Sequence, residues 1–244
     1  ERTLLFDTGI RGTIASAGLP FLETQSISPD TVTHVVVSHL DVDHSGDVGS
    51  VKALLPQAEI IAHRGDAEAI SNWDAFLVQR GREFATGWGL DESPEAINWM
   101  RDVFSPGPVD TVLTSEISVD LGGNRIVDIW HVPGHSHGHL AVHDSVNDTL
   151  AVSDAILGSS VPLADKTPSF PPTYRHVDAY LATIERVRKR QPETLLTAHY
   201  GDFHAEEVSA FLNESQLFVR RLDEAVKEVL GPEPQTLEEI VRQG

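Results

Sequence analysis

Four side chains that can bind a metal stand within the six residues 39–44, directly after an apolar segment. They are His39, Asp41, Asp43 and His44, and the segment before them contains the run Val35-Val36-Val37. In a loop that leaves a strand, these side chains can converge on a small volume. Imidazole nitrogens and carboxylate oxygens are the ligands that Zn²⁺, Fe²⁺ and Mn²⁺ bind in proteins. The pattern therefore favours a metal site over a solvated polar loop.

Three further candidate ligands follow apolar segments later in the chain. His135 comes after a Pro-Gly pair, whose tight turn can direct the imidazole, and Asp154 and His199 each end an apolar run. Because open α/β sheets collect ligands at the carboxyl ends of their strands, we expect these side chains to lie near the first cluster.

The order of these residues resembles the metallo-β-lactamase superfamily. The family motif HxHxDH is present here as the variant HxDxDH at 39–44, and His135, Asp154 and His199 follow in the family's order. The resemblance covers nearly the whole chain. It implies an α/β fold, an αβ/βα four-layer sandwich in which helices flank two mixed β-sheets. The metals would lie at one edge, between the sheets.

The resemblance also implies two metal ions and a metal-bridging hydroxide as the nucleophile. The implied ligands are His39, Asp41 and His135 for one ion, Asp43, His44 and His199 for the other, and Asp154 as the bridge. Asp43 and Asp154 are thereby the expected catalytic residues. Asp7 either accepts a hydrogen bond from a ligand imidazole or is an ordinary turn residue.

Asp41 is the departure from the family motif, which usually has histidine at this position. With two divalent ions, the carboxylates of Asp41, Asp43 and Asp154 and a hydroxide give a first shell of zero net charge. Such a shell is a weaker Lewis acid and favours harder or redox-active ions. We expect two divalent ions, zinc before manganese or iron. Asp41 is either a ligand or only a hydrogen-bonding neighbour beside a weak or empty first site.

Other polar residues carry weaker signals. Tyr174 and Tyr200 could assist substrate or oxyanion binding, although packing is the simpler explanation for each. His137 and His139 have no ligand role in the family, and we expect neither to bind metal. His63 follows an apolar run and is assigned to the surface or to packing.

Apolar runs of strand length precede the candidate ligands. They span residues 4–6, 32–38, 59–62, 126–132, 140–143, 149–152 and 194–198. Helical spacing of apolar residues predicts helices over 71–82, 178–190 and about 205–230. The apolar stripe of the last helix, which includes Val208, Val219, Leu222 and Val226, is assigned to the core rather than to a dimer surface.

The chain is interpreted as one domain, 1–244. It opens at Glu1 and reaches the apolar run 4–6 almost at once, and the resemblance implies that an N-terminal strand of the family fold is missing. Residues 64–110 and 157–176 interrupt the strand pattern and are expected to be inserted or lid segments that decide the substrate. The aromatic side chains of 71–104 either wall an apolar pocket or belong to the core.

Composition excludes several classes of protein. The 244 residues include no cysteine, which rules out disulfides, thiolate metal sites and cysteine nucleophiles. A net charge of −19 makes nucleic acid and anionic membranes poor partners. A small-molecule substrate and a homodimer are compatible with the chain. Without a signal peptide or an apolar run of membrane-spanning length, we expect a cytoplasmic protein.

These observations favour a dinuclear metal hydrolase that cleaves a small ester or lactone. The absence of cysteine counts against β-lactamase subclasses that use a cysteine ligand, and the acidic chain counts against nucleases. Two alternatives stay open. One is a diiron or mononuclear iron redox protein of the same fold, which Asp41 favours, and the other is a binding module that has lost a metal.

Overall fold

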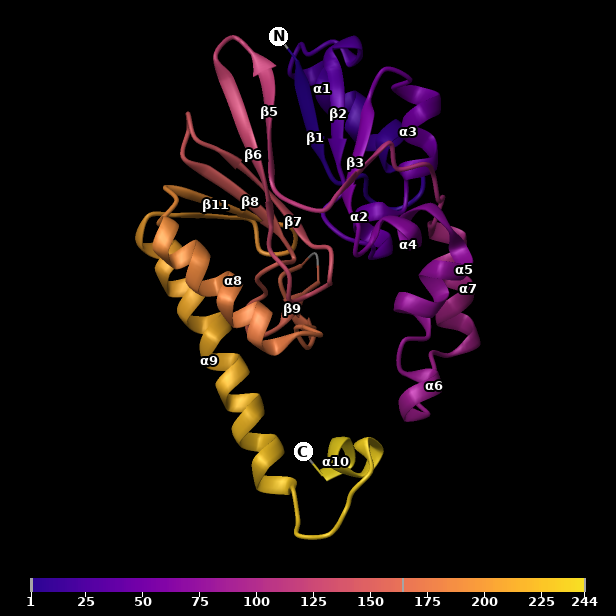
Figure 1. The fold of residues 1–244 in the computed structure, drawn as a ribbon, viewed down its shortest axis with the longest axis vertical. Helices are drawn as coiled ribbons and strands as arrows, with labels where there is room; N and C mark the ends of the chain where they lie inside the picture. The colour runs from indigo at the N-terminus through magenta and orange to yellow at the C-terminus, as the bar shows by residue number, and fades with distance from the viewer. Residues whose placement is uncertain (1, 164, 244) are drawn as a thin grey trace.

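The computed structural model describes residues 2–163 and 165–243. Two β-sheets face each other, and helices cover the outer face of each sheet (Figure 1). The predicted αβ/βα arrangement is therefore confirmed. Within the described residues, no helix is both long enough and apolar enough to cross a membrane.

The first sheet has four strands in the order β1-β2-β3-β4, all parallel, so the prediction of a mixed sheet is wrong for this one. They are β1 (Thr3–Phe6), β2 (Val32–Val36), β3 (Glu59–His63) and β4 (Thr111–Leu113). The helical segments between the first three are η1 (Ile14–Gly18), α1 (Leu19–Thr24), η2 (Pro29–Thr31), α2 (Val42–Ser45) and α3 (Val48–Leu54). Parallel strands need such crossover connections.

The second sheet is mixed and has the order β12-β11-β8-β7-β6-β5. Its strands are β5 (Ile117–Gly122), β6 (Arg125–His131), β7 (Leu140–Asp144), β8 (Thr149–Ser153), β11 (Thr194–Thr197) and β12 (Asp202–His204). Only β8 and β11 pair in parallel, and α8 (Val177–Arg190) lies between them in the chain. The last helices are α9 (Glu206–Val229) and α10 (Leu237–Gln243).

The central strand β2 is buried on both faces, as its continuous apolar run predicts. Val35 and Val37 face the core between the first sheet and its helices, whereas Val36 faces the core between the two sheets. A third cluster, which includes Tyr180 and Phe211, joins the second sheet to α8 and α9. Packing on both sides fixes the end of β2, from which the HxDxDH loop leaves.

The predicted strand 32–38 ends earlier than expected because the chain turns into the site. The amide of Ser38 donates to Asp7 Oδ1 at 2.6 Å instead of continuing a strand ladder. Strands β4, β5 and β12 are absent from the sequence-based prediction. β4 is three residues long, and the apolar and polar residues of β5 alternate because one face is exposed.

Residues 64–110 connect β3 to β4 as a helical arm. It contains α4 (Ala67–Ser71), α5 (Trp73–Phe76), the π-helix η3 (Leu77–Gly81), α6 (Ala85–Trp88) and α7 (Pro94–Val103). The single helix predicted over 71–82 is therefore wrong. The Asn72 side chain caps a new helix at Trp73, and the next turn widens until the amide of Arg82 donates to the carbonyl oxygen of Leu77.

The second predicted insert, 157–176, carries a small two-stranded sheet of β9 (Val161–Pro162) and β10 (Pro168–Phe170). The assignment of the whole α9 stripe to the core is also wrong. Val208 and Val219 are buried, but Leu222 is exposed because the second half of α9 projects beyond the sheet (Figure 1).

Candidate metal centre

Four loops bring all seven predicted ligands to one edge between the sheets. The loop after β2 carries His39 and Asp41 and runs into α2, where Asp43 and His44 lie. The other three follow β6, β8 and β11, and they are His135, Asp154 and His199.

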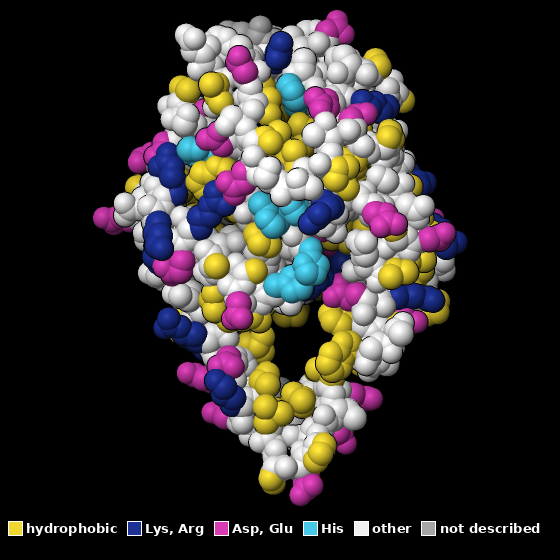
Figure 2. Space-filling view, viewed as in Figure 1, with side chains coloured by type: hydrophobic (Ala, Val, Ile, Leu, Met, Phe, Trp, Pro, Cys, Tyr) yellow, Lys and Arg dark blue, Asp and Glu magenta, His cyan; other side chains and the backbone are white. Residues whose placement is uncertain are grey.

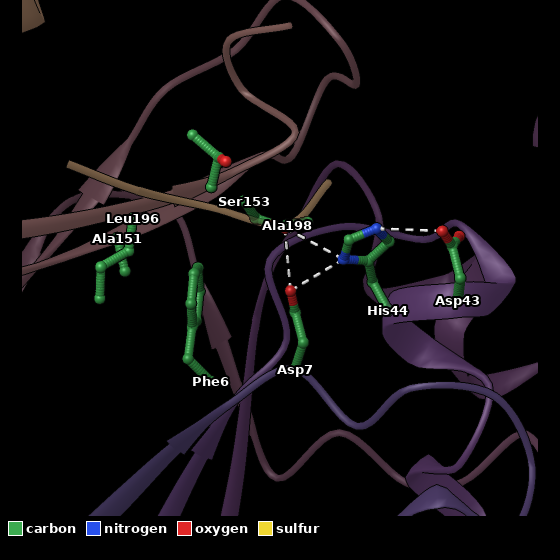
Figure 3. A pocket seen from close by; sticks show the side chains of 9 residues that line it. Phe6, Asp7, Asp43, His44, Ala151, Ser153, Leu196 and Ala198 are labelled. Atoms are coloured by element: carbon green, nitrogen blue, oxygen red, sulfur yellow. Dashed lines mark hydrogen bonds and ion pairs between the residues drawn. The ribbon is translucent and has the colours of Figure 1, made fainter. Parts of the chain in front are cut away.

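One group of ligand atoms consists of Asp43, His44, His199 and Asp154. Asp43 Oδ2 lies 3.4 Å from His44 Nε2 and 3.6 Å from His199 Nε2 (Figure 3 shows the first pair). Asp154 Oδ2 lies 3.4 Å and 3.2 Å from the same two nitrogens. Atoms bound at about 2.0–2.1 Å to a tetrahedral metal lie roughly 3.3–3.4 Å apart, so these four have suitable spacing.

A second group surrounds His39 Nε2 and His135 Nε2, which are 3.1 Å apart. Asp41 Oδ2 lies 3.7 Å from the first nitrogen and 3.4 Å from the second. Ligand atoms of His39, His135 and Asp154 all lie within 4.8 Å of one another. Asp154 thus belongs to both groups, as a bridging ligand must.

Two buried atoms of the site, His44 Nε2 and Asp154 Oδ1, have no hydrogen-bond partner among the described residues. An unsatisfied buried polar atom costs about 1–3 kcal/mol. A divalent cation would satisfy both atoms, because each offers a lone pair. The donor set and its spacing therefore fit a pair of metal ions.

The neighbours of three histidines direct Nε2 into the site. His135 Nδ1 donates to the carbonyl oxygen of Thr173 at 2.6 Å, and His44 Nδ1 donates to Asp7 Oδ2 at 2.9 Å. His39 Nδ1 lies 2.9 Å from Ser38 Oγ, which in turn donates to Asp7 Oδ2. These contacts select the tautomer whose Nε2 lone pair can bind a metal.

Asp7 occupies the position of an acceptor for a ligand imidazole. Figure 3 shows its carboxylate directed at the His44 ring, and Ser153 Oγ donates to the same oxygen at 2.9 Å. Its backbone has φ +68°, which non-glycine residues rarely adopt. This turn after β1 brings the carboxylate under the site.

Asp41 divides its two oxygens between the site and an arginine. Arg80 Nε donates to Asp41 Oδ1 at 2.6 Å, while Oδ2 faces the two imidazoles. Although burial opposes ionisation, the Arg80 guanidinium holds the pKa of Asp41 well below its usual range. The carboxylate is thus ionised.

The charges of the other group are also strongly coupled. Although burial favours the neutral acid, His44 and His199 hold the pKa of Asp154 well below its ordinary value. The hydrogen bond from His199 to Asp154 raises the pKa of that histidine. Both shifts favour the charged forms, a protonated imidazole beside an ionised carboxylate.

The structure places the weaker candidates outside the two groups. His139 is buried and stacks on His39 at 4.6 Å, and His137 packs on the ring of His176 at 3.8 Å. Tyr200 accepts a hydrogen bond from the amide of Gly158, and Tyr174 stacks on Tyr180. His63 is buried and stacks on His131, in agreement with a packing role.

Three residues that hold the site were not singled out from the sequence. They are Arg80, Thr173 and Asp66. Asp66 accepts hydrogen bonds from Ser136 Oγ at 2.6 Å and Gly138 N at 2.8 Å, and so fixes the loop that carries His135. Each of these residues contacts a partner that is distant in the sequence, and no local motif predicts such a contact.

Two cavities adjoin the site. One, of about 410 Å³, is lined by Asp43, His44 and apolar residues of β1 and β11. The other, of about 610 Å³, lies beside Arg80 and Thr173, between the helical arm and α9. Figure 2 shows an opening there whose walls carry hydrophobic side chains, below a group of histidines.

Fold and site together define a metallo-β-lactamase-fold protein. The family profile of the Metallo-beta-lactamase superfamily matches residues 1–199, so the chain belongs to this superfamily. The chain is also similar to the metallo-beta-lactamase family protein TTHA1429 from Thermus thermophilus, with a TM-score of 0.69 and 19% identity. That match covers 96% of this chain and 76% of the other and shows the shared fold.

Two curated relatives are named acyl-coenzyme A thioesterase MBLAC2. The protein of Homo sapiens is 26% identical over 223 residues, which cover 84% of this chain and 72% of the relative. The protein of Bos taurus is 28% identical over 180 residues, or 70% of this chain and 57% of the relative. The chain therefore matches only part of each relative's length.

Proposed function

We propose that the chain is a metal-dependent hydrolase of a carboxylic ester or thioester with an apolar acyl group. The observation that carries this proposal is the pair of ligand groups at the end of the sheets, with Asp154 in the first group and within 3.4 Å of the His44 and His199 nitrogens of the second. Two divalent ions held there would polarise the substrate carbonyl and activate a water molecule. Family membership and the names of the relatives support hydrolysis.

The chain's own residues hold and orient these ions. Asp154 reaches both groups, while Asp7 and Thr173 fix the imidazoles of His44 and His135. Asp43 is the most accessible of the seven ligands, with 47% of its side chain exposed. Substrate is therefore proposed to approach from the side of Asp43.

An apolar acyl group would lie in the cavity beside the helical arm. Phe84, Trp88 and Leu222 line this cavity, and all three side chains are exposed. A neighbouring cavity of about 450 Å³ shares Tyr174 and Leu222 with it and continues along α8 and α9. Two adjoining cavities with apolar walls suit an aliphatic acyl chain.

Two arginines of this region are already paired with carboxylates. Arg175 binds Glu83 at 2.7 Å and Arg82 lies 3.5 Å from Asp91. A highly anionic leaving group thus gains little from these two arginines, so the acyl part is proposed to provide most of the recognition. Lactones, which lack a separate leaving group, are the second substrate class.

A substrate panel tests the proposal. Acyl thioesters of coenzyme A and of N-acetylcysteamine, matching esters and lactones are assayed with short and long acyl chains. We expect zinc- or manganese-dependent hydrolysis that improves with chain length. Metal-independent turnover, or no turnover of any member by protein that binds two ions, would contradict the proposal.

Leu222→Glu tests the acyl site. Two methylenes buried at Leu222 are worth about 1.6 kcal/mol, or slightly more than tenfold in kcat/KM for long chains. Acetyl substrates should be unaffected. Leu217→Glu is the matched control, because Leu217 is equally exposed on α9 but does not line either cavity.

The diiron redox protein remains the second candidate, because Asp41 supplies a carboxylate at a position where histidine is usual. Metal analysis separates the two candidates. Two irons with a visible absorption band, in protein without hydrolase activity, would favour the redox function.

A further inference from the structure

The helical arm contributes one charged side chain to the metal centre. Arg80 lies in the π-helix η3, and its Nε donates to Asp41 Oδ1 at 2.6 Å. Both side chains are largely buried, with 24% of Arg80 and 12% of Asp41 exposed. An ion pair this shielded is screened by water much less than a surface pair.

The core of the first sheet anchors this arm. Phe76, the residue directly before η3, is buried and stacks on Phe104 at 4.9 Å. Trp73 packs on the same ring pair. The π-helix that follows is a rare geometry that is often found at functional sites. Arg80 is therefore presented by a packed element and not by a free loop.

The geometry leaves only one oxygen of Asp41 for a metal. Oδ1 is bonded to the guanidinium, and Oδ2 lies 3.4 Å from His135 Nε2 and 3.7 Å from His39 Nε2. A histidine ligand also offers a single atom. The Asp41 carboxylate paired with Arg80 therefore offers a metal one atom, as the histidine of the family motif does at this position.

The charges match as well. Asp41, Asp43 and Asp154 give the ligand set three negative charges, whereas histidine at position 41 would leave two. The guanidinium of Arg80 restores the lower total. An Asp–Arg pair thus has both the single donor atom and the net charge of a neutral histidine.

We propose that Asp41 and Arg80 act together as the replacement for the second histidine of HxHxDH, with Arg80 as a positioning residue for the first metal. Arg80 keeps Asp41 monodentate and offsets its charge, so the site retains a preference for zinc over harder ions. This inference rests on the proposed dinuclear function. The helical arm is then part of the metal centre as well as a wall of the substrate cavity.

A double-mutant cycle on positions 41 and 80 tests the proposal without substrate. Wild type, Arg80→Met, Asp41→His and the double variant are stripped of metal. Zinc and manganese dissociation constants are then measured by competition with a chromophoric chelator. Elemental mass spectrometry gives the number of ions per chain, and thermal unfolding shows that each variant is folded.

Removal of Arg80 should have opposite effects in the two backgrounds. In the Asp41 background, Arg80→Met should weaken zinc binding at least about tenfold and thereby lower the preference for zinc over manganese, as is typical when the partner of a metal ligand is altered. Beside a histidine at position 41, the unpaired guanidinium repels the cation. There, Arg80→Met should tighten zinc binding by about the same factor.

Arg80→Lys keeps the charge but loses the planar donor geometry, so its change in metal preference should be smaller than that of Arg80→Met. Arg82→Met is the control on the same segment, because Arg82 is exposed and pairs with Asp91. It should leave both dissociation constants unchanged.

Equal effects of Arg80→Met in both backgrounds would show a structural role and overturn the inference. So would tighter zinc binding beside Asp41, which would mean that Arg80 competes with the metal. If no variant and no wild-type protein binds two ions, the proposed function itself fails. The two failures are therefore distinguishable.

Discussion

Asp7 supports the candidate site without belonging to either ligand group. Its carboxylate accepts hydrogen bonds from Ser38, Ser153 and His44, and so connects the ends of β1, β2 and β8 below the candidate metal site. The carboxylate also makes the His44 imidazole a better electron donor. A residue of this kind is recognised from its contacts and not from its place in a turn.

Replacement of Asp7 by Asn is expected to weaken metal binding by about 10–100-fold, because the amide is a poorer acceptor for His44 Nδ1. Chelator competition measures the loss. Asp47→Asn is the control, since Asp47 is a buried carboxylate that accepts from Ile14 N at 2.8 Å outside the site. Asp47→Asn should lower stability but not metal affinity, and equal affinity losses in both variants would refute the role of Asp7.

Metal binding is expected to release protons near neutral pH. Although burial opposes the charge, Asp154 and Asp7 raise the pKa of His44 well above its usual value, and the pKa of His199 is raised by its bond to Asp154. A raised pKa means that metal must displace a proton, so affinity should fall as pH falls, by up to about tenfold per pH unit for each proton.

Calorimetry in buffers of different ionisation enthalpy counts the released protons. The expected count at neutral pH is roughly one to two, because two histidines are affected. Affinity that stays constant from about pH 8 to pH 6 would show that these histidines are already neutral without metal.

At the scale of elements, the turn before His135 depends on a glycine. Gly134 has φ +146°, and a Cβ there would lie 2.5 Å from the Tyr180 backbone in α8. Its carbonyl oxygen also accepts from the amides of Arg175 and His176. The turn thus sets the distance between α8 and the ligand.

Gly134→Ala should destabilise the protein by about 1–3 kcal/mol and weaken zinc binding, because α8 and the His135 loop must separate. Denaturant unfolding and chelator competition measure the two effects. Gly87→Ala is the control, since a Cβ at Gly87 meets no atom within 4 Å. A neutral result for Gly134→Ala would show that the loop adjusts freely.

Elements that a short stretch of sequence specifies could be predicted from the sequence. The four strands that precede the candidate ligands could be predicted because each is an apolar run. The path of α9 beyond Val219 could not be predicted, because the same apolar stripe can face a core or solvent. The Asp41–Arg80 pair was missed because its partners lie 39 positions apart in the chain.

At the scale of the whole molecule, the net charge of −19 acts on any anionic substrate. Repulsion should raise KM for coenzyme A thioesters at low ionic strength. Increasing salt from about 0.01 M to 0.15 M shortens the screening length from roughly 30 to 8 Å, so KM should fall. The matching N-acetylcysteamine thioester is the uncharged control. If salt changed both KM values equally, this explanation would fail.

The helical arm and α9 both line the cavity of about 610 Å³. The helical arm and α9 lie on opposite sides of the opening in Figure 2, so the proposed substrate cavity is formed by segments far apart in the chain. The homodimer considered from composition remains a prediction, as does the single-domain interpretation.

The central claim is that seven side chains hold two metal ions, and metal content tests it most directly. Elemental mass spectrometry on purified protein, repeated after chelation and titration with zinc, should give two ions per chain. Asp154→Ala should lose both, because Asp154 reaches both groups. Wild-type protein that binds no ion, or Asp154→Ala protein that still binds two, would contradict the account.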